Sequence, residues 1–201
     1  MAEHKLPEVR KKEIVAKAYE LFTEYGVDKT SITQIAKAVG VAKGLLYYYF
    51  KSKDEILDAV VDSLCEEQVS ILSQRLSNHG HDVLDKILIL LDTFYEIHPY
   101  YGLRPIHPNQ EDAYLITSFH ERYLKFAEKI VEQIIEEGQA QGYFQIQHPK
   151  LMFVVTLEGI YGLTKVYPIS KREITDLVEQ SLAIPHNALY ERSAEVLTSF
   201  S

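Results

Sequence analysis

Apolar residues recur at helical spacing along nearly the whole chain. Over residues 10–25 they fall three and four positions apart, and Gly26 follows where a helix commonly ends. The same spacing is found over 32–39, 43–50, 53–72, 82–98, 110–138 and 149–167, and on both sides of Pro185. No stretch alternates apolar and polar residues over the length of a strand, and 143–147 is too short to count. The pattern predicts an all-α fold with about nine helices.

Polar residues mark where several of these helices begin and end. Three sequences have the Ser-x-x-Gln or Ser-x-x-Glu pattern of a capping box, in which two side chains satisfy the first backbone N–H groups of a helix. They are Ser31 with Gln34, Ser52 with Glu55, and Ser170 with Glu173. Asp82 is a further expected cap. The segment 99–109 holds three prolines and a glycine, which predicts a loop or a broken helix.

The segment 30–53 has the pattern of a helix-turn-helix. Two short helical stretches are separated by Gly40, which permits a tight turn. Helices this short need buried inner faces to be stable. The expected buried residues are Ile35, Ala36, Val39, Val41, Leu46 and Phe50. Cations and hydroxyls for phosphate oxygens are expected from Lys43, Tyr47, Tyr48, Tyr49, Lys51 and Lys53.

A longer series of residues around this segment points to a known family. A first helix ending in Tyr25-Gly26 is followed by Thr30, Ile32, Ile35-Ala36, Val39-Gly40-Val41, Lys43-Gly44, Leu46-Tyr47, Phe50 and Lys53. This series, between Ile14 and about Leu57, resembles the DNA-binding domain of TetR-family transcriptional regulators. The sequence from Glu137 to Phe144, followed by His148-Pro149, also resembles the turn before that family's dimerisation helices.

The resemblance implies an all-α homodimer with two domains. Residues 1–53 would form the helix-turn-helix domain, and 54–201 a helical bundle for ligand binding and dimerisation. Phosphate contacts are implied at Thr30, Thr33, Tyr47, Tyr49 and Lys53, and positions nearest the base edges at Lys43, Gly44, Leu45 and Tyr48. The chain departs from the family at Ala42, where Ser or Thr is frequent, at Leu45, where a small or hydroxylated residue is commoner, and at Tyr49, where His is frequent. These departures leave the operator sequence unpredicted.

Charged residues are distributed unevenly along the chain, which suggests two parts with different functions. The net charge is −8, yet residues 1–53 hold ten Lys and Arg against six Asp and Glu. The remaining residues hold 11 basic and 23 acidic side chains. A basic head on an acidic body is what a DNA-binding domain joined to a second domain would show, although such asymmetry also arises by chance.

The acidic body contains a set of aromatic and polar residues that could line a ligand site between helices. The candidates are Tyr95, His98, Tyr101, Phe119, Tyr123, Phe126, Glu158 and Tyr161. Glu158 stands in an otherwise apolar stretch, which suggests a counter-charge for a cationic aromatic ligand. The alternatives are that the aromatic residues are core and that Glu158 faces solvent or a dimer interface. Gly159 and Gly162 favour close helix packing between subunits.

Other classes of function find little support in the sequence. It has no Gly-x-Ser-x-Gly, phosphate-binding loop or His-Glu-x-x-His, so we expect no enzyme, and we expect neither a cofactor nor a metal site. We interpret the pair His79-x-His81 as part of an exposed turn and not as a metal site. A single cysteine, the lack of a signal-like start and the lack of a long apolar run predict a cytoplasmic protein that does not enter a membrane.

The sequence therefore predicts a homodimeric regulator that binds a near-palindromic double-stranded operator, as a repressor released by a small apolar or aromatic effector. Two alternatives remain. One is a DNA-binding or architectural protein without a ligand, and the other is a ligand-binding helical bundle without a DNA role.

Overall fold

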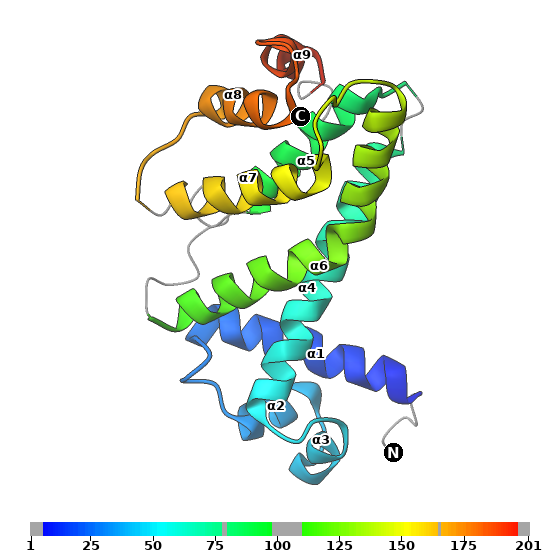
Figure 1. Cartoon of the computed structure of the whole chain (residues 1–201). Coiled ribbons are helices and arrows are strands. Elements are labelled where there is room, and N and C mark those ends of the chain that lie inside the picture. Colours follow the sequence, from blue (N-terminus) through cyan, green and yellow to red (C-terminus); the bar gives the residue numbers. More distant parts are fainter. Residues whose placement is uncertain (1–5, 78–79, 98–109, 165, 197–201) are drawn as a thin grey trace. The chain divides into compact units, whose positions relative to one another are not determined.

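The chain is helical throughout the part that the computed structural model describes. This part comprises residues 6–77, 80–97, 110–164 and 166–196, with side chains described except at 95–97, 110–116 and 194–196. It contains nine α-helices and no strand, which confirms the predicted fold class. The helices are α1 (Pro7–Tyr25), α2 (Ile32–Val39), α3 (Lys43–Tyr49), α4 (Lys53–Leu76), α5 (Val83–Ile97), α6 (Gln110–Ala140), α7 (Pro149–Thr164), α8 (Lys171–Leu182) and α9 (Ala188–Val196) (Figure 1).

Two of the three predicted capping boxes are fully formed. Ser31 and Ser170 accept hydrogen bonds from the backbone three residues on, and the side chains of Gln34 and Glu173 bond back to the capping residues. The Ser170 hydrogen bonds lower the pKa of the Glu173 carboxyl. These contacts satisfy backbone groups that a helix end otherwise exposes.

The third box, at the start of α4, differs from the prediction. Ser52 Oγ accepts from the Glu55 backbone as expected, but Glu55 Oε2 accepts from the backbone N–H of Lys51, at 2.6 Å. The Glu55 carboxylate therefore satisfies the backbone N–H of Lys51, the residue before the cap, instead of the N–H of Ser52 itself. At α5, Asp82 Oδ1 accepts from the backbone of Leu84 and Asp85 and caps the helix as predicted.

Two helix boundaries differ from the prediction. α1 begins at Pro7, earlier than predicted, because proline fits the first turn of a helix. α6 continues past Gly138 to Ala140 before the chain turns through Gly142, which has a φ of 79°. A Cβ at Gly138 would lie 2.0 Å from the ring of Phe144, so the missing side chain lets this buried ring pack against the helix.

The helices form two compact units. Unit 1 lies within Met1–Gln68 and Pro105–Phe126, and unit 2 within Val69–Arg104 and Ala127–Ser201, so α4 and α6 contribute residues to both. In unit 1, α1 packs against α2 and α2 against α3. Figure 1 shows α1, α2 and α3 gathered around the first turns of α4. The buried core of this unit includes Ile14, Ala18, Phe22, Ile35, Leu46, Phe50, Ile56, Val60 and Val61.

Unit 2 is a helical bundle with ion pairs at its margins. α7 packs on α8, and α9 packs on both α5 and α8. Its core includes Leu72, Ile87, Val131, Ile135, Phe153, Leu157, Ile174, Val178, Leu182 and Leu189. Arg75 donates to Asp92 at 2.5 Å and to Thr93 at 2.8 Å, joining α4 to α5. Among the described residues, no helix combines the length and apolar character needed to cross a bilayer.

Candidate DNA-binding interface

The turn between α2 and α3 depends on a left-handed residue. Gly40 has φ 75° and ψ 34°, a conformation that glycine adopts without the strain of a Cβ. Its N–H bonds back to Ala36 and Lys37, and Val41 N–H donates to Ala36 O at 3.0 Å. These contacts end α2 and set the direction in which α3 leaves the turn.

The inner side of this motif is apolar, as the sequence predicted. Ile35 and Leu46 are fully buried, and Ala36 and Phe50 nearly so. Val39 and Val41 are half-buried. The Lys11 ammonium of α1 lies 5.5 Å from the centre of the Phe50 ring, so α1 also covers this side. Burial of Leu46 and Phe50 fixes which face of α3 points outward.

The outer side of α3 carries a cation, an apolar side chain and two tyrosines. Lys43, Gly44, Leu45, Tyr47 and Tyr48 are exposed, and 77% of Tyr48 is accessible to solvent. The Lys43 ammonium lies 5.8 Å from the Tyr47 ring centre, and Tyr48 meets the half-buried Tyr49 edge-on at 5.2 Å. A Cβ at Gly44 would meet no atom within 4 Å. Ala42 supplies no side-chain cap to α3.

Three implied phosphate contacts lie on other elements. Thr33 is exposed on α2. Lys53 is half-buried and its Nζ donates to Val27 O at 2.9 Å, so it also fixes the loop after α1. Thr30 is only 1% exposed, and its hydroxyl donates to Gly26 O at 2.8 Å and Leu21 O at 3.2 Å. Burial corrects the expectation for Thr30, because its side chain holds the end of α1 and cannot reach an external phosphate.

The candidate ligand residues with described side chains are divided between the two units. Phe119 and Tyr123 stack with ring centres 5.8 Å apart in unit 1, and Phe126 is exposed near the end of that unit. Glu158 and Tyr161 belong to unit 2. Tyr95 has no described side chain, and His98 and Tyr101 lie outside the described residues.

Beside the aromatic pair, Arg122 joins α6 to α4. Its guanidinium donates to Asp58 Oδ1 at 2.5 Å and to Asp62 Oδ1 at 2.6 Å. Nearby, Cys65 is fully buried and its Sγ lies 3.7 Å from Phe119 O. Burial, with a smaller contribution from Asp62, raises the pKa of the Cys65 thiol to about 12. Sequence reasoning missed the Arg122 contacts because some sixty residues separate the partners and no local pattern marks them.

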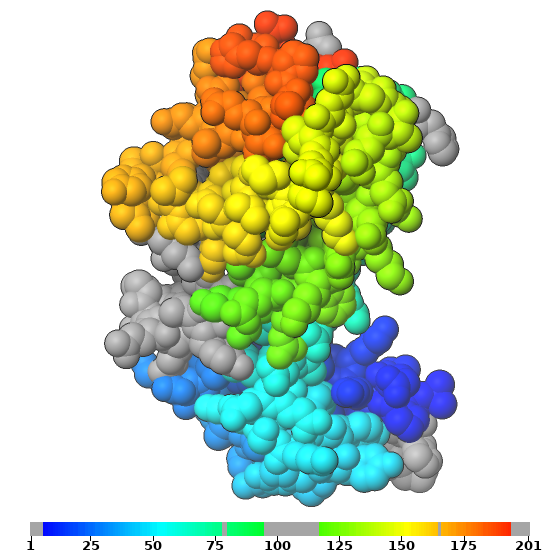
Figure 2. All heavy atoms as spheres, in the orientation of Figure 1, coloured from blue at the N-terminus to red at the C-terminus, as the bar shows by residue number. Residues whose placement is uncertain are grey.

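One side of α7 is apolar and exposed. Phe153, Leu157, Ile160 and Tyr161 are buried. The exposed residues recur every three or four positions and are Leu151, Met152, Val155, Glu158, Gly159, Gly162 and Leu163, which we call the α7 outer face. In Figure 2 the surface of α7, yellow to orange, is open on the side in view. Glu158 thus lies on the side of the helix away from the core.

The comparisons with known proteins agree with this geometry. Residues 14–60 match the family model described as bacterial regulatory proteins, tetR family. The HTH-type transcriptional regulator YhgD of Bacillus subtilis is 26% identical over 85% of this chain and 93% of its own length. The helix-turn-helix segment of the chain is therefore of the TetR type.

Two further similar proteins are informative. The biofilm operon icaADBC negative transcriptional regulator IcaR of Staphylococcus aureus is 35% identical over 39% of this chain and 43% of its own length. The crystal structure of RolR in complex with resorcinol superposes with a TM-score of 0.64, at 17% identity, over 94% of this chain and 93% of that one. The likeness of fold therefore extends beyond the matched segment. The helix-turn-helix of α2 and α3 lies within the segment that matches the tetR family model.

Proposed function

We propose that this TetR-family regulator is a homodimeric repressor that leaves its operator when a small effector binds. The proposal rests on the exposed outer side of α3, which is held in place by the fully buried Leu46 of the same helix. The exposed residues are Lys43, Gly44, Leu45, Tyr47 and Tyr48. Repression is supported by IcaR, which is named a negative regulator.

The proposed mode of DNA binding places α3 in the major groove. Lys43, Gly44, Leu45 and Tyr48 would lie nearest the base edges, and Leu45 suits the methyl group of a thymine. Thr33, Tyr47, Tyr49 and Lys53 would contact phosphates. Lys53 donates one hydrogen bond to Val27, and its ammonium retains further donors for DNA. Two copies of α3 would reach successive major grooves about 34–36 Å apart, which requires a near-palindromic operator.

This mode is tested by two lysine substitutions. An operator is first selected from a random-sequence duplex library with the full-length protein, and affinities are then measured by fluorescence anisotropy over a range of salt. We expect Lys43→Ala to cost about 1–3 kcal/mol and to relax specificity at one base position. We expect Lys53→Ala to weaken binding to all sequences alike and to lower the salt slope by about one unit.

A third lysine provides the control. Lys125 is exposed on α6 of the same unit and does not belong to the helix-turn-helix, so Lys125→Ala should leave operator affinity unchanged. Thermal unfolding of Lys53→Ala separates a lost phosphate contact from a lost bond to Val27. Unchanged affinity in both the Lys43 and Lys53 variants would remove this face from the DNA interface.

The α7 outer face supports the proposed dimer. Leu151 and Val155 are 60% and 55% exposed, and no atom lies within 4 Å of where a Cβ would stand at Gly159 or Gly162. Apolar side chains beside glycines allow two helices to approach closely, and an exposed apolar face of this kind favours association. We assign Glu158 to this face instead of to the effector site, since it lies among these residues.

The proposed effector is a small aromatic or apolar molecule that contacts Phe119, Tyr123 and Phe126 of α6. RolR, which has a similar fold, is described in complex with the aromatic ligand resorcinol. Because Arg122 lies between these residues and bonds to α4, movement of α6 would be transmitted to the helix that follows the DNA-binding motif. Release then requires an effector that binds the DNA-incompetent state more tightly.

The alternative is a DNA-binding protein that responds to no ligand. Anisotropy on the selected operator with a panel of neutral, cationic and anionic aromatic compounds distinguishes the two. Release by one class, lost in Tyr123→Ala, supports the effector, whereas unchanged operator affinity across the panel favours the alternative.

A further inference from the structure

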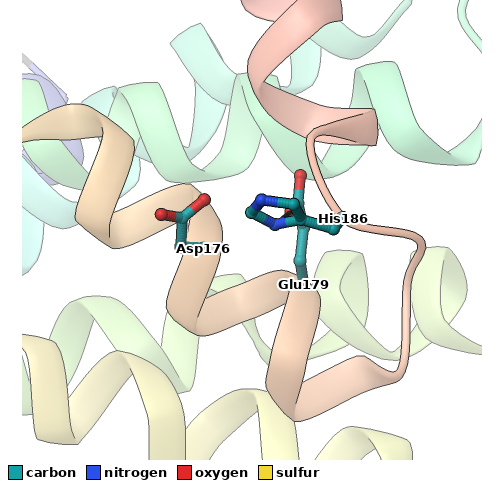
Figure 3. Close-up of side chains that lie close together, drawn as sticks. All are labelled: Asp176, Glu179 and His186. Carbon is teal, nitrogen blue, oxygen red and sulfur yellow. Dashed lines mark ion pairs between the residues drawn. The ribbon is translucent and has the colours of Figure 1, made fainter.

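Three metal-ligating side chains come together at the end of α8. Asp176 and Glu179 stand three residues apart on this helix, which places them on adjacent turns of one side. His186 lies in the connection to α9 and its ring points back toward the helix (Figure 3). One potential ligand atom from each of the three residues lies within 4.8 Å of the other two, and His186 Nδ1 is 3.7 Å from Glu179 Oε2.

Glu179 is a buried carboxylate in a fixed position. Its side chain is 2% exposed, and its two oxygens accept hydrogen bonds from the backbone of Asn187 and Leu189, each at 2.8 Å. These bonds join α8 to the start of α9. Each carboxylate oxygen has a second lone pair, so both oxygens retain the capacity to bind a cation.

The other two residues complement this fixed carboxylate. Asp176 Oδ1 is shielded from solvent and accepts no hydrogen bond from the described residues. A shielded carboxylate oxygen without a partner is costly, and a cation would satisfy it. His186 is 69% exposed, which leaves its ring free to adjust and gives an ion a route from solvent.

We propose that Asp176, Glu179 and His186 bind one divalent transition-metal ion per chain, with Zn²⁺ as the representative ion. An imidazole with two carboxylates is a donor set for Zn²⁺ and similar ions, whereas Mg²⁺ and Ca²⁺ prefer oxygen ligands alone. At bond lengths of about 2.0–2.2 Å, neighbouring ligand atoms of a tetrahedral ion lie about 3.3–3.6 Å apart. The three atoms, now within 4.8 Å of one another, therefore need to close by at most about 1.5 Å. Water would complete the coordination.

The consequence of this site is local. A bound ion would connect α8 to the 183–187 connection, which already contains two left-handed residues, Ala183 with φ 54° and Asn187 with φ 67°. Ion binding would therefore stabilise the junction of α8 and α9, and it requires neither DNA nor an effector. Its outcome is independent of the proposed repressor function.

The test is titration of the chelator-treated full-length protein with ZnCl₂ by isothermal calorimetry. We expect one ion per chain, a raised unfolding temperature with Zn²⁺, and a visible absorption band when Co²⁺ replaces it. Asp176→Asn and His186→Ala should each weaken Zn²⁺ binding at least tenfold, because even changes outside the ligand shell commonly cost about that much. Both variants should fold, since the first is isosteric and the second changes an exposed ring. Glu179→Gln is unsuitable because Glu179 also holds α9.

Two controls decide what a positive titration means. His148 is exposed at the start of α7, and His148→Ala should bind Zn²⁺ as the unaltered chain does. MgCl₂ should give no comparable heat. Retention of full Zn²⁺ affinity in either Asp176→Asn or His186→Ala, or equal affinity for Mg²⁺, would overturn the assignment.

Discussion

Gly44 stands on the exposed side of α3 without any structural need for a glycine. Its φ lies outside the left-handed region, and an added Cβ meets no neighbour. In an isolated protein, Gly44→Ala should therefore leave the fold intact and stabilise it by up to about 1 kcal/mol, because alanine favours a helix more than glycine does. If this residue faces base edges, the extra methyl group should weaken operator binding roughly tenfold, or about 1.4 kcal/mol.

Thermal unfolding and anisotropy measured on the same Gly44→Ala sample separate the two effects. Raised stability together with reduced operator affinity is the expected combination. An operator affinity equal to that of the unaltered chain would mean that the backbone of α3 does not approach the bases at Gly44.

Cys65 illustrates a residue whose chemistry is suppressed by its surroundings. Its thiolate would be buried and close to the Asp62 carboxylate, and the pKa of the thiol is raised to about 12 from an ordinary value near 8.5. We expect the folded protein to react with a disulfide reagent at pH 8 at least about a thousandfold more slowly than a free thiol does. The reaction should become fast in 6 M guanidinium (a denaturing concentration), and rapid labelling of the folded protein would contradict the burial.

The outer side of α3 could be predicted because one helical period relates each exposed residue to the buried Leu46 and Phe50. The roles of Thr30 and Lys53 could not, because their partners are backbone carbonyls of the α1 end and the following loop, whose approach depends on tertiary packing. The proposed metal site could not be predicted from the sequence for a similar reason. Only the fold brings His186 back toward Asp176 and Glu179.

At the scale of helices, Arg122 is the side chain that links α6 to α4 in unit 1. Its partners are partly exposed, which limits their contribution, and we expect Arg122→Ala to lower the free energy of unfolding by about 1 kcal/mol. The measurement is urea denaturation at low and high salt. The loss of stability should be smaller at 1 M salt, where the Debye length is only about 3 Å and charge–charge attraction is strongly screened.

Arg122→Lys is the matched control, because lysine keeps the charge but cannot bridge two carboxylates with a planar fork. Its stability should lie between that of the unaltered chain and that of Arg122→Ala. A salt-independent loss in Arg122→Ala would instead indicate that packing of the arginine stem dominates.

The helices could be predicted because the 3.6-residue apolar period and the capping residues indicate the same boundaries for most of them. The failures have separate physical causes. At Ser52 the glutamate of the box accepts a neighbouring N–H, and at Gly138 a long-range contact with Phe144 makes glycine useful inside a helix. The spacing of residues along the chain predicts neither the Glu55 contact with Lys51 nor the Gly138 contact with Phe144.

For the whole molecule, the proposed dimer rests on the α7 outer face. Gly162→Arg places a long charged side chain where two helices would approach closely, and it should give monomers or aggregates with lost operator binding. Sedimentation velocity measures the oligomeric state. Gln139→Arg, at an exposed position on α6, should remain dimeric, whereas a fully dimeric Gly162→Arg would reject this placement of the interface.

The contact between Gly138 and Phe144 has an evolutionary consequence. A ring that occupies the volume of an absent Cβ makes the two positions a covarying pair, because a larger residue at 138 is tolerated only if 144 becomes smaller or turns away. Among homologous sequences, glycine at the first position should therefore accompany an aromatic residue at the second. Such a pairing would identify the same turn in relatives whose remaining residues have diverged.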